Sequence, residues 1–122
     1  MFPYIGGKAH HVGWLDPLFP NKFDKFVEVF GGAGWVSVKS KKVEQATTRI
    51  YNDFNPLLAN VYECFRTNPT GLLAKMNATP KSDINVYKQY QQELFGTLDW
   101  TNVTLGDIDL AVKYLYLQTQ VF

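Results

Sequence analysis

The sequence has little of three things that would place it in a class at once: cysteine, net charge and long apolar runs. Its single cysteine, Cys64, cannot build a disulfide framework or a cysteine-based zinc site. Twelve Lys and Arg residues against eleven Asp and Glu residues leave a formal charge of +1, so no field of the whole molecule attracts nucleic acid or a membrane. The sequence also shows no secretory signal and no apolar run of about 18 residues. We therefore expect a cytoplasmic protein that makes no contact with a membrane.

The composition that is present suits one compact α/β unit. Hydrophobic residues make up 46% and aromatic residues 16% of the 122 positions, which is enough apolar surface for a buried core and too much for a disordered chain. No internal repeat and no Ser/Gly-rich linker divides the sequence. We predict a single unit over residues 1–122, in which strands and helices alternate over 1–67 and helices alone follow over 68–122.

Two short strands are predicted in the first half, each followed by a helix. Phe26 to Phe30 is a β-prone run that ends at a glycine cluster, and a helix-compatible segment follows from Trp35. A second strand is predicted over 48–52. Asn55 can then cap a helix that has Pro56 in its first turn.

Four further segments are helix-compatible. The first is ended by Pro17 and Pro20, and the last carries a stripe of Leu and Tyr side chains that we interpret as core rather than as a ligand site. The four segments cover residues 9–15, 70–76, 84–95 and 105–121.

Glycines and an acidic residue occur in the order that a nucleotide-type ligand requires. Gly31, Gly32 and Gly34 lie between a predicted strand and a predicted helix, where a backbone without Cβ atoms lets a ligand approach closely and a helix N-terminus offers N–H donors. Asp53 follows the next strand, where a carboxylate can accept hydrogen bonds from both ribose hydroxyls. Together these residues predict a cofactor that contains adenosine.

Two other nucleotide-binding motifs can be compared with these residues. A P-loop requires a strand before its Gly-Lys pair and Ser or Thr after it, whereas Gly7-Lys8 lacks such a strand and is followed by Ala9. The dinucleotide fingerprint G-x-G-x-x-G matches from Gly32 except at its third glycine, where Ser37 stands. A dinucleotide-binding oxidoreductase therefore remains an alternative.

Three motifs follow one another in the first half of the chain. They are Tyr4-Ile5-Gly6-Gly7-Lys8, Val27-Glu28-Val29-Phe30-Gly31-Gly32-Ala33-Gly34 and Tyr51-Asn52-Asp53-Phe54-Asn55-Pro56. Their order and residues resemble those of the Dam-type adenine-specific DNA methyltransferases, which have an aromatic-x-Gly-Gly-Lys motif, a Glu-Pro-Phe-x-Gly-x-Gly loop for S-adenosylmethionine and an Asn-Asp-x-Asn-Pro segment. The resemblance spans the first half of the chain and is weaker over residues 86–95 and 111–117.

The resemblance implies a partial Rossmann-like fold of the S-adenosylmethionine-dependent methyltransferases, with few strands and a helix-rich second half. It implies that Asp53 binds the cofactor ribose, that Tyr4 and Lys8 line the methionine end, and that the glycine loop lies beneath the cofactor. The cofactor-binding residues that it implies are Tyr4, Gly6, Gly7, Lys8, Phe30, Gly31, Gly32, Ala33, Gly34 and Asp53.

The sequence departs from the family pattern in three places. Val29 stands where the family has proline, which alters the stiffness of the loop more than its chemistry, and Trp35 replaces a small residue. The family's catalytic Asp-Pro-Pro-Tyr motif, which holds a flipped adenine, has no counterpart because the sequence contains no Pro-Pro pair. We therefore assign no catalytic residue and interpret the chain as an amino-terminal piece of a longer enzyme that is inactive alone.

The enzyme implied by the resemblance transfers a methyl group from S-adenosylmethionine to the exocyclic amino group of adenine in double-stranded DNA. A non-catalytic binding module, or one half of a split enzyme, is a second interpretation that also accounts for the missing motif. No metal site is assigned, since the adjacent His10 and His11 would point about 100° apart on a helix. A sheet with only two strands has open edges, so we expect a tendency to self-associate.

Overall fold

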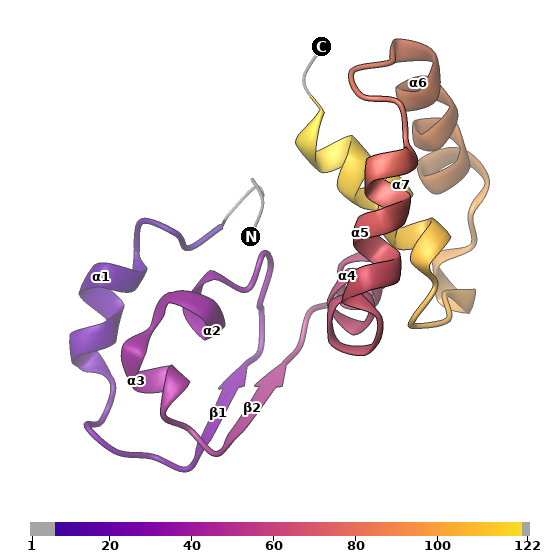
Figure 1. Cartoon of the computed structure of the whole chain (residues 1–122). Helices are drawn as coiled ribbons and strands as arrows, with labels where there is room; N and C mark the ends of the chain where they lie inside the picture. Colours follow the sequence, from indigo (N-terminus) through magenta and orange to yellow (C-terminus); the bar gives the residue numbers. More distant parts are fainter. Residues whose placement is uncertain (1–6, 121–122) are drawn as a thin grey trace. The chain divides into compact units, whose positions relative to one another are not determined.

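The computed structural model describes residues 7–120, which form two compact units that divide between Phe54 and Asn55 (Figure 1). The first unit mixes helices and strands, whereas the regular elements of the second are all helical. The first contains α1 (Val12–Leu15), a 3₁₀ turn (Asp16–Leu18), β1 (Lys25–Glu28), α2 (Trp35–Lys39), α3 (Lys41–Glu44) and β2 (Thr48–Tyr51). The second contains α4 (Pro56–Thr67), α5 (Pro69–Ala78), α6 (Ile84–Gln92), a π turn (Glu93–Thr97), a 3₁₀ turn (Trp100–Asn102) and α7 (Ile108–Thr119).

The two strands pair in parallel, with Lys25 opposite Thr48 and Glu28 opposite Tyr51. Parallel strands cannot be joined by a tight hairpin, and here α2 and α3 make the crossover between them. Both strands therefore end at the same edge of the sheet, which brings together the segments that follow them. Within the described residues each strand has one neighbour, and self-association through the sheet edges stays a prediction.

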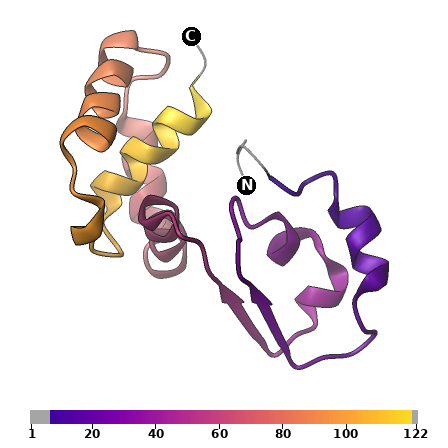
Figure 2. The same cartoon turned by 180° about the vertical axis from the view of Figure 1, so that it is seen from behind.

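The helices of the first unit cover one face of the strand pair. Figures 1 and 2 show α1, α2 and α3 on the same side of the strands. Residues alternate along β1, so that Phe26 and Glu28 are turned towards these helices while Val27 and Val29 stay exposed. The core of the unit is built from Val12, Val36 and Val43, against which pack Leu15, Phe19, Phe23, Phe26 and Trp35.

The first helix differs from its prediction at Pro17. The sequence predicted that a helix over 9–15 would be ended by this proline, but the α-helix begins only at Val12 and a 3₁₀ turn continues through Pro17 to Leu18. Proline fits there because it lies in the first turn of the 3₁₀ segment, where its missing N–H is not needed. The helical backbone ends at Phe19, which is extended.

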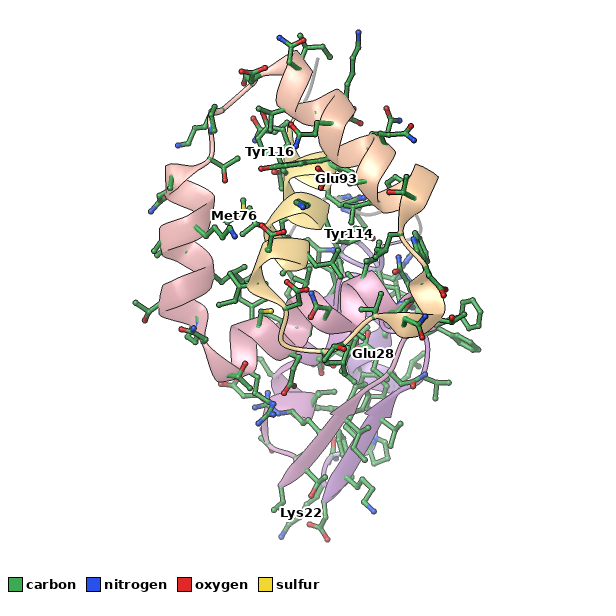
Figure 3. The ribbon with its side chains drawn as sticks, turned by 90° about the vertical axis from the view of Figure 1, so that its right-hand side faces the viewer. Lys22, Glu28, Met76, Glu93, Tyr114 and Tyr116 are labelled. Carbon is green, nitrogen blue, oxygen red and sulfur yellow. The ribbon has the colours of Figure 1, made fainter. Side chains whose placement is uncertain are left out.

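The second unit is organised around α7, which contacts α4, α5 and α6. Its inward face is almost wholly apolar. The ring of Tyr116, labelled in Figure 3, meets that of Tyr90 of α6 edge to face. The stripe predicted as core is confirmed at Tyr114 and Leu117, while Val121 lies outside the described residues. The buried residues of α7 are Ala111, Val112, Tyr114, Leu115, Tyr116 and Leu117.

Local signals placed most helix starts correctly. The predicted cap at Asn55 is confirmed: its side chain accepts hydrogen bonds from the N–H groups of Leu57 (3.0 Å) and Leu58 (3.4 Å). The last helix begins at Ile108 rather than at the predicted residue 105, because Gly106 has a φ of 94° that no helix accommodates. Asp107 then caps α7.

A buried asparagine ties α4 to the turn before α7. Asn60 is fully buried, its amide donates to the carbonyl of Asp107 (2.8 Å), and its oxygen accepts from the N–H groups of Gly106 (2.8 Å) and Asp107 (2.9 Å). One side chain therefore satisfies three backbone groups of a tight turn.

We expect Asn60→Ala to lower the free energy of unfolding by about 2–3 kcal/mol, because three backbone groups lose their partner together. Urea denaturation followed by circular dichroism measures the change. Asn77→Ala, at an exposed position of α5, is the matched control and should shift stability by less than about 0.5 kcal/mol. Equal stability of the two variants would contradict this role of Asn60.

Candidate cofactor-binding site

The glycine loop joins β1 to α2 through a tight turn, in which the N–H of Gly34 donates to the carbonyl of Gly31 (2.9 Å). Gly32 and Gly34 have φ values of 52° and 68°, in the left-handed region that residues with a Cβ atom adopt at a cost. Ala33, between them, is fully buried. The glycines at 32 and 34 are thus required by the backbone itself.

Asp53 lies directly against this loop. Its Oδ2 accepts a hydrogen bond of 2.8 Å from the N–H of Gly32, although the two residues are 21 positions apart. The contact follows from the parallel pairing, which places the residues after β1 and after β2 at one edge. The structure therefore brings together the glycines and the acidic residue on which the sequence prediction of an adenosine cofactor rested.

The segment before α1 reaches the same loop. The ammonium group of Lys8 donates to the carbonyl of Phe30 at 2.7 Å, which joins the first motif to the second. The Phe30 side chain is 76% exposed, so its ring is open to a ligand. Of the other residues predicted for this site, Gly7 is described and partly exposed, whereas Tyr4 and Gly6 lie outside the described residues.

A cavity of about 240 Å³ lies along β1 beside these residues. Lys8 and Glu28 are the polar residues that line it, and the other lining residues are apolar. The apolar residues lining it are Leu15, Phe19, Phe26, Val27, Val29, Phe30 and Val36.

Glu28 has a role that the sequence did not predict. It is 6% exposed, and its Oε2 accepts hydrogen bonds from the N–H of Ser37 (3.1 Å) and from the Ser37 hydroxyl (Figure 3 labels Glu28). Its other oxygen, Oε1, is buried without a hydrogen-bond partner in the described part of the chain. The signal in the sequence was an acidic residue in the middle of the apolar run 26–30, which is unusual unless the charge is bound.

The end of β2 holds the loop through more than Asp53. The carbonyl of Asn52 accepts from the N–H of Gly31 (2.8 Å), and its side-chain amide donates to the carbonyl of Val29 (2.8 Å). The hydroxyl of Tyr51 donates to the carbonyl of Gly32 (2.6 Å). No residue pattern in one strand predicts contacts to another, so neither side chain was assigned a role from the sequence.

The densest basic cluster of the sequence consists of the lysines at 39, 41 and 42. Lys42 donates to the carbonyls of Phe19 (2.7 Å) and Pro17 (3.4 Å), and Lys39 lies over the Trp35 ring, 4.6 Å from its centroid. Two of the three lysines are therefore engaged in local contacts.

The described residues contain no group of three or more His, Cys, Asp or Glu side chains that could hold a metal ion. Among residues 7–120 no helix is long and apolar enough to cross a membrane.

We expect Glu28→Ala to lower the free energy of unfolding by about 1–3 kcal/mol, because the two donors of Ser37 lose their acceptor in a buried place. Glu44→Ala, at an exposed position of α3, is the control and should change it by less than about 0.5 kcal/mol. Thermal and urea unfolding give both values. Ser37→Ala removes the hydroxyl donor and keeps the N–H donor, so it should cost part of what Glu28→Ala costs. If Ser37→Ala has no effect, the bond from the Ser37 hydroxyl does not contribute to the loss.

Comparisons of the sequence with known proteins found a family and a relative. The model of a protein family, the D12 class N6 adenine-specific DNA methyltransferases, matches residues 4–121. The sequence is 35% identical to the modification methylase StsI of Streptococcus sanguinis over 68 residues. These residues are 54% of this chain and 10% of that methylase. No solved structure matches the chain. The matches give no support to a dinucleotide-binding oxidoreductase. Methyltransferases of the D12 class depend on S-adenosylmethionine, and this chain belongs to that family.

Proposed function

We propose that the chain binds S-adenosylmethionine at the edge where β1 and β2 end, and that it serves the methylation of adenine in DNA. The observation that carries the proposal is the hydrogen bond from the Gly32 N–H to Asp53, which joins two family motifs in one place. Family membership supplies the identity of the cofactor.

The carboxylate of Asp53 can serve the loop and a ribose together. A carboxylate can accept several hydrogen bonds on its two oxygens, and the N–H of Gly32 is one of the donors that Asp53 binds. A ribose presents two neighbouring hydroxyl donors, which suit one carboxylate. Asp53 is half-buried, which strengthens such bonds relative to those of an exposed side chain.

The loop and Lys8 would form the rest of the cofactor site. Because Gly32 and Gly34 lack side chains, a ligand can approach the backbone at this edge. Lys8 is held over the start of the loop by the Phe30 carbonyl, where the resemblance puts the methionine end of the cofactor. Tyr4, Gly6 and Gly7 complete the proposed set on the resemblance alone.

The arrangement of the first unit supports a partial Rossmann-like fold. In open α/β sheets, ligands bind outside the carboxyl ends of parallel strands, and the loop and Asp53 occupy that position here. The fold proposal thus rests on one parallel strand pair with its helical crossover.

DNA is the proposed partner and adenine the proposed target. When bound, S-adenosylmethionine supplies a methyl group on a positively charged sulfur, which the family's reaction moves to the exocyclic nitrogen of adenine. The relative in Streptococcus sanguinis is called a modification methylase, and we propose the same restriction-modification setting for this chain. The chain spans about a tenth of that relative's length.

The chain supplies the cofactor side of this reaction and no assigned catalytic residue. The only Asp-Pro in the sequence is Asp16-Pro17, and Asp16 is engaged by the hydroxyl of Ser40 in the first unit. Because the Asp16 carboxylate is bound in this contact, we assign it no role in holding a target base.

We expect the purified 122-residue chain to transfer no methyl group to duplex DNA, because it contains no Asp-Pro-Pro-Tyr motif to hold the target adenine. Transfer of a tritiated methyl group to adenine-containing duplexes measures this. Methyl transfer that persists after the protein has been purified a second time would contradict the interpretation of the chain as catalytically incomplete.

We expect calorimetric titration to show binding of S-adenosylmethionine and none of nicotinamide dinucleotide. Asp53→Ala should weaken cofactor binding by about 1–3 kcal/mol, since a charged acceptor is removed from the ribose. Asp24→Ala is the matched control, because Asp24 is an exposed acidic residue at the opposite end of β1 and should leave the affinity unchanged. An unchanged affinity in Asp53→Ala would remove this residue from the site, and absence of binding by the unmodified chain would overturn the proposed function.

A further inference from the structure

Three consecutive residues at the end of β2 hold the glycine loop. Gly31 donates its N–H to the carbonyl of Asn52 (2.8 Å), and Gly32 donates its N–H to Asp53 (2.8 Å). The carbonyl of Gly32 accepts from the hydroxyl of Tyr51 (2.6 Å). Both backbone polar groups of Gly32 are therefore bound by side chains of one neighbouring segment, which fixes the orientation of its peptide groups.

The ring of Tyr51 also occupies the space that a side chain at position 31 would need. A Cβ atom built on Gly31 would lie 2.2 Å from Cε2 and 2.5 Å from Cδ2 of that ring. The φ of Gly31 is not in the left-handed region, so its backbone alone does not demand glycine. Glycine at this position is a steric consequence of Tyr51, unlike glycine at Gly32 and Gly34.

The Tyr51 ring cannot move aside without losing its hydrogen bond to Gly32. Its hydroxyl is bound to Gly32, and its backbone lies in β2, opposite Glu28. A side chain at residue 31 would therefore push the ring away from its hydrogen bond or shift the loop. Tyr51 and Gly31 form one packing unit.

We propose that Tyr51 is a positioning residue that holds the glycine loop in the conformation that binds the cofactor and makes glycine at position 31 obligatory. The inference rests on the function proposed above, in which this loop binds S-adenosylmethionine. A loop ordered in advance loses less conformational freedom when a ligand binds, so the affinity is higher than with a mobile loop. Tyr51 acts through Gly31 and Gly32, in contrast to Asp53, which is proposed to contact the cofactor itself.

The first experiment removes only the hydroxyl. In Tyr51→Phe the ring remains beside Gly31 and the hydrogen bond to Gly32 is lost. We expect the affinity for S-adenosylmethionine, measured by calorimetry, to fall about three- to tenfold. Hydrogen exchange of the Gly31 and Gly32 amides, measured by NMR without cofactor, should become at least about tenfold faster.

Tyr116→Phe is the matched control. The Tyr116 hydroxyl is also hydrogen-bonded, to the backbone of Asp83 (3.0 and 3.3 Å), but it lies in the second unit. Its loss should lower the melting temperature without changing the affinity or the exchange of the loop amides. The control separates a general loss of stability from an effect on the loop.

The second experiment tests the packing through a double-mutant cycle. Gly31→Ala should reduce the affinity about tenfold or more in the natural background, because the methyl group displaces the ring. In the Tyr51→Ala background the same substitution should cost less than about twofold, since the space is then open. Equal losses in both backgrounds would overturn the steric part of the inference.

The outcomes distinguish this inference from the proposed function. If the unmodified chain binds S-adenosylmethionine and Tyr51→Phe binds equally well, with unchanged amide exchange, Tyr51 is not a positioning residue. If the unmodified chain does not bind the cofactor, the proposed function fails, and the amide exchange alone decides whether Tyr51 orders the loop. Faster exchange in Tyr51→Phe then supports that ordering, and unchanged exchange overturns it.

Discussion

The parallel pairing of β1 with β2 is the constraint on which the candidate site depends. It sets Glu28 opposite Tyr51, so the segments that follow the two strands leave the sheet side by side. The bond between Gly32 and Asp53 is the direct consequence. Had the strands paired in antiparallel fashion, the residues after them would lie at opposite edges of the sheet, and the motifs could not share a ligand.

The loop is held from both strands, and each strand contributes differently. Glu28 of β1 binds the backbone and hydroxyl of Ser37, which anchors the first turn of α2 to the strand. The end of β2 binds the glycines themselves. A loop that is fixed at its helix end and along its middle has little freedom left, so it loses little conformational entropy when a ligand binds.

The second unit is stabilised by contacts of a different kind. Its core is apolar and centred on α7, while Asn60 supplies the polar contacts that fix the turn before that helix. Lys113 pairs with Glu93 and Asp109, and Lys75 also pairs with Asp109. The hydrogen bond from Lys113 lowers the pKa of Glu93, whereas the pKa of Asp109 is lowered first by Lys75 and then by Lys113. None of these residues belongs to the proposed cofactor site.

The sequence by itself determined the local structure: a strand predicted over 48–52 and observed over 48–51, the cap at Asn55 followed by Pro56, and the glycine turn before Trp35. Such features depend on neighbours in the chain, so residue types at short spacing predict them. Family motifs in order also predicted which residues form the proposed cofactor-binding loop. Only the tertiary structure decided that Lys8 binds the Phe30 carbonyl, that Glu28 binds Ser37 and that Tyr51 fills the space beside Gly31. The reason is physical: these contacts join residues from 9 to 22 positions apart, and their geometry exists only once the strands have paired and the helices have covered one face.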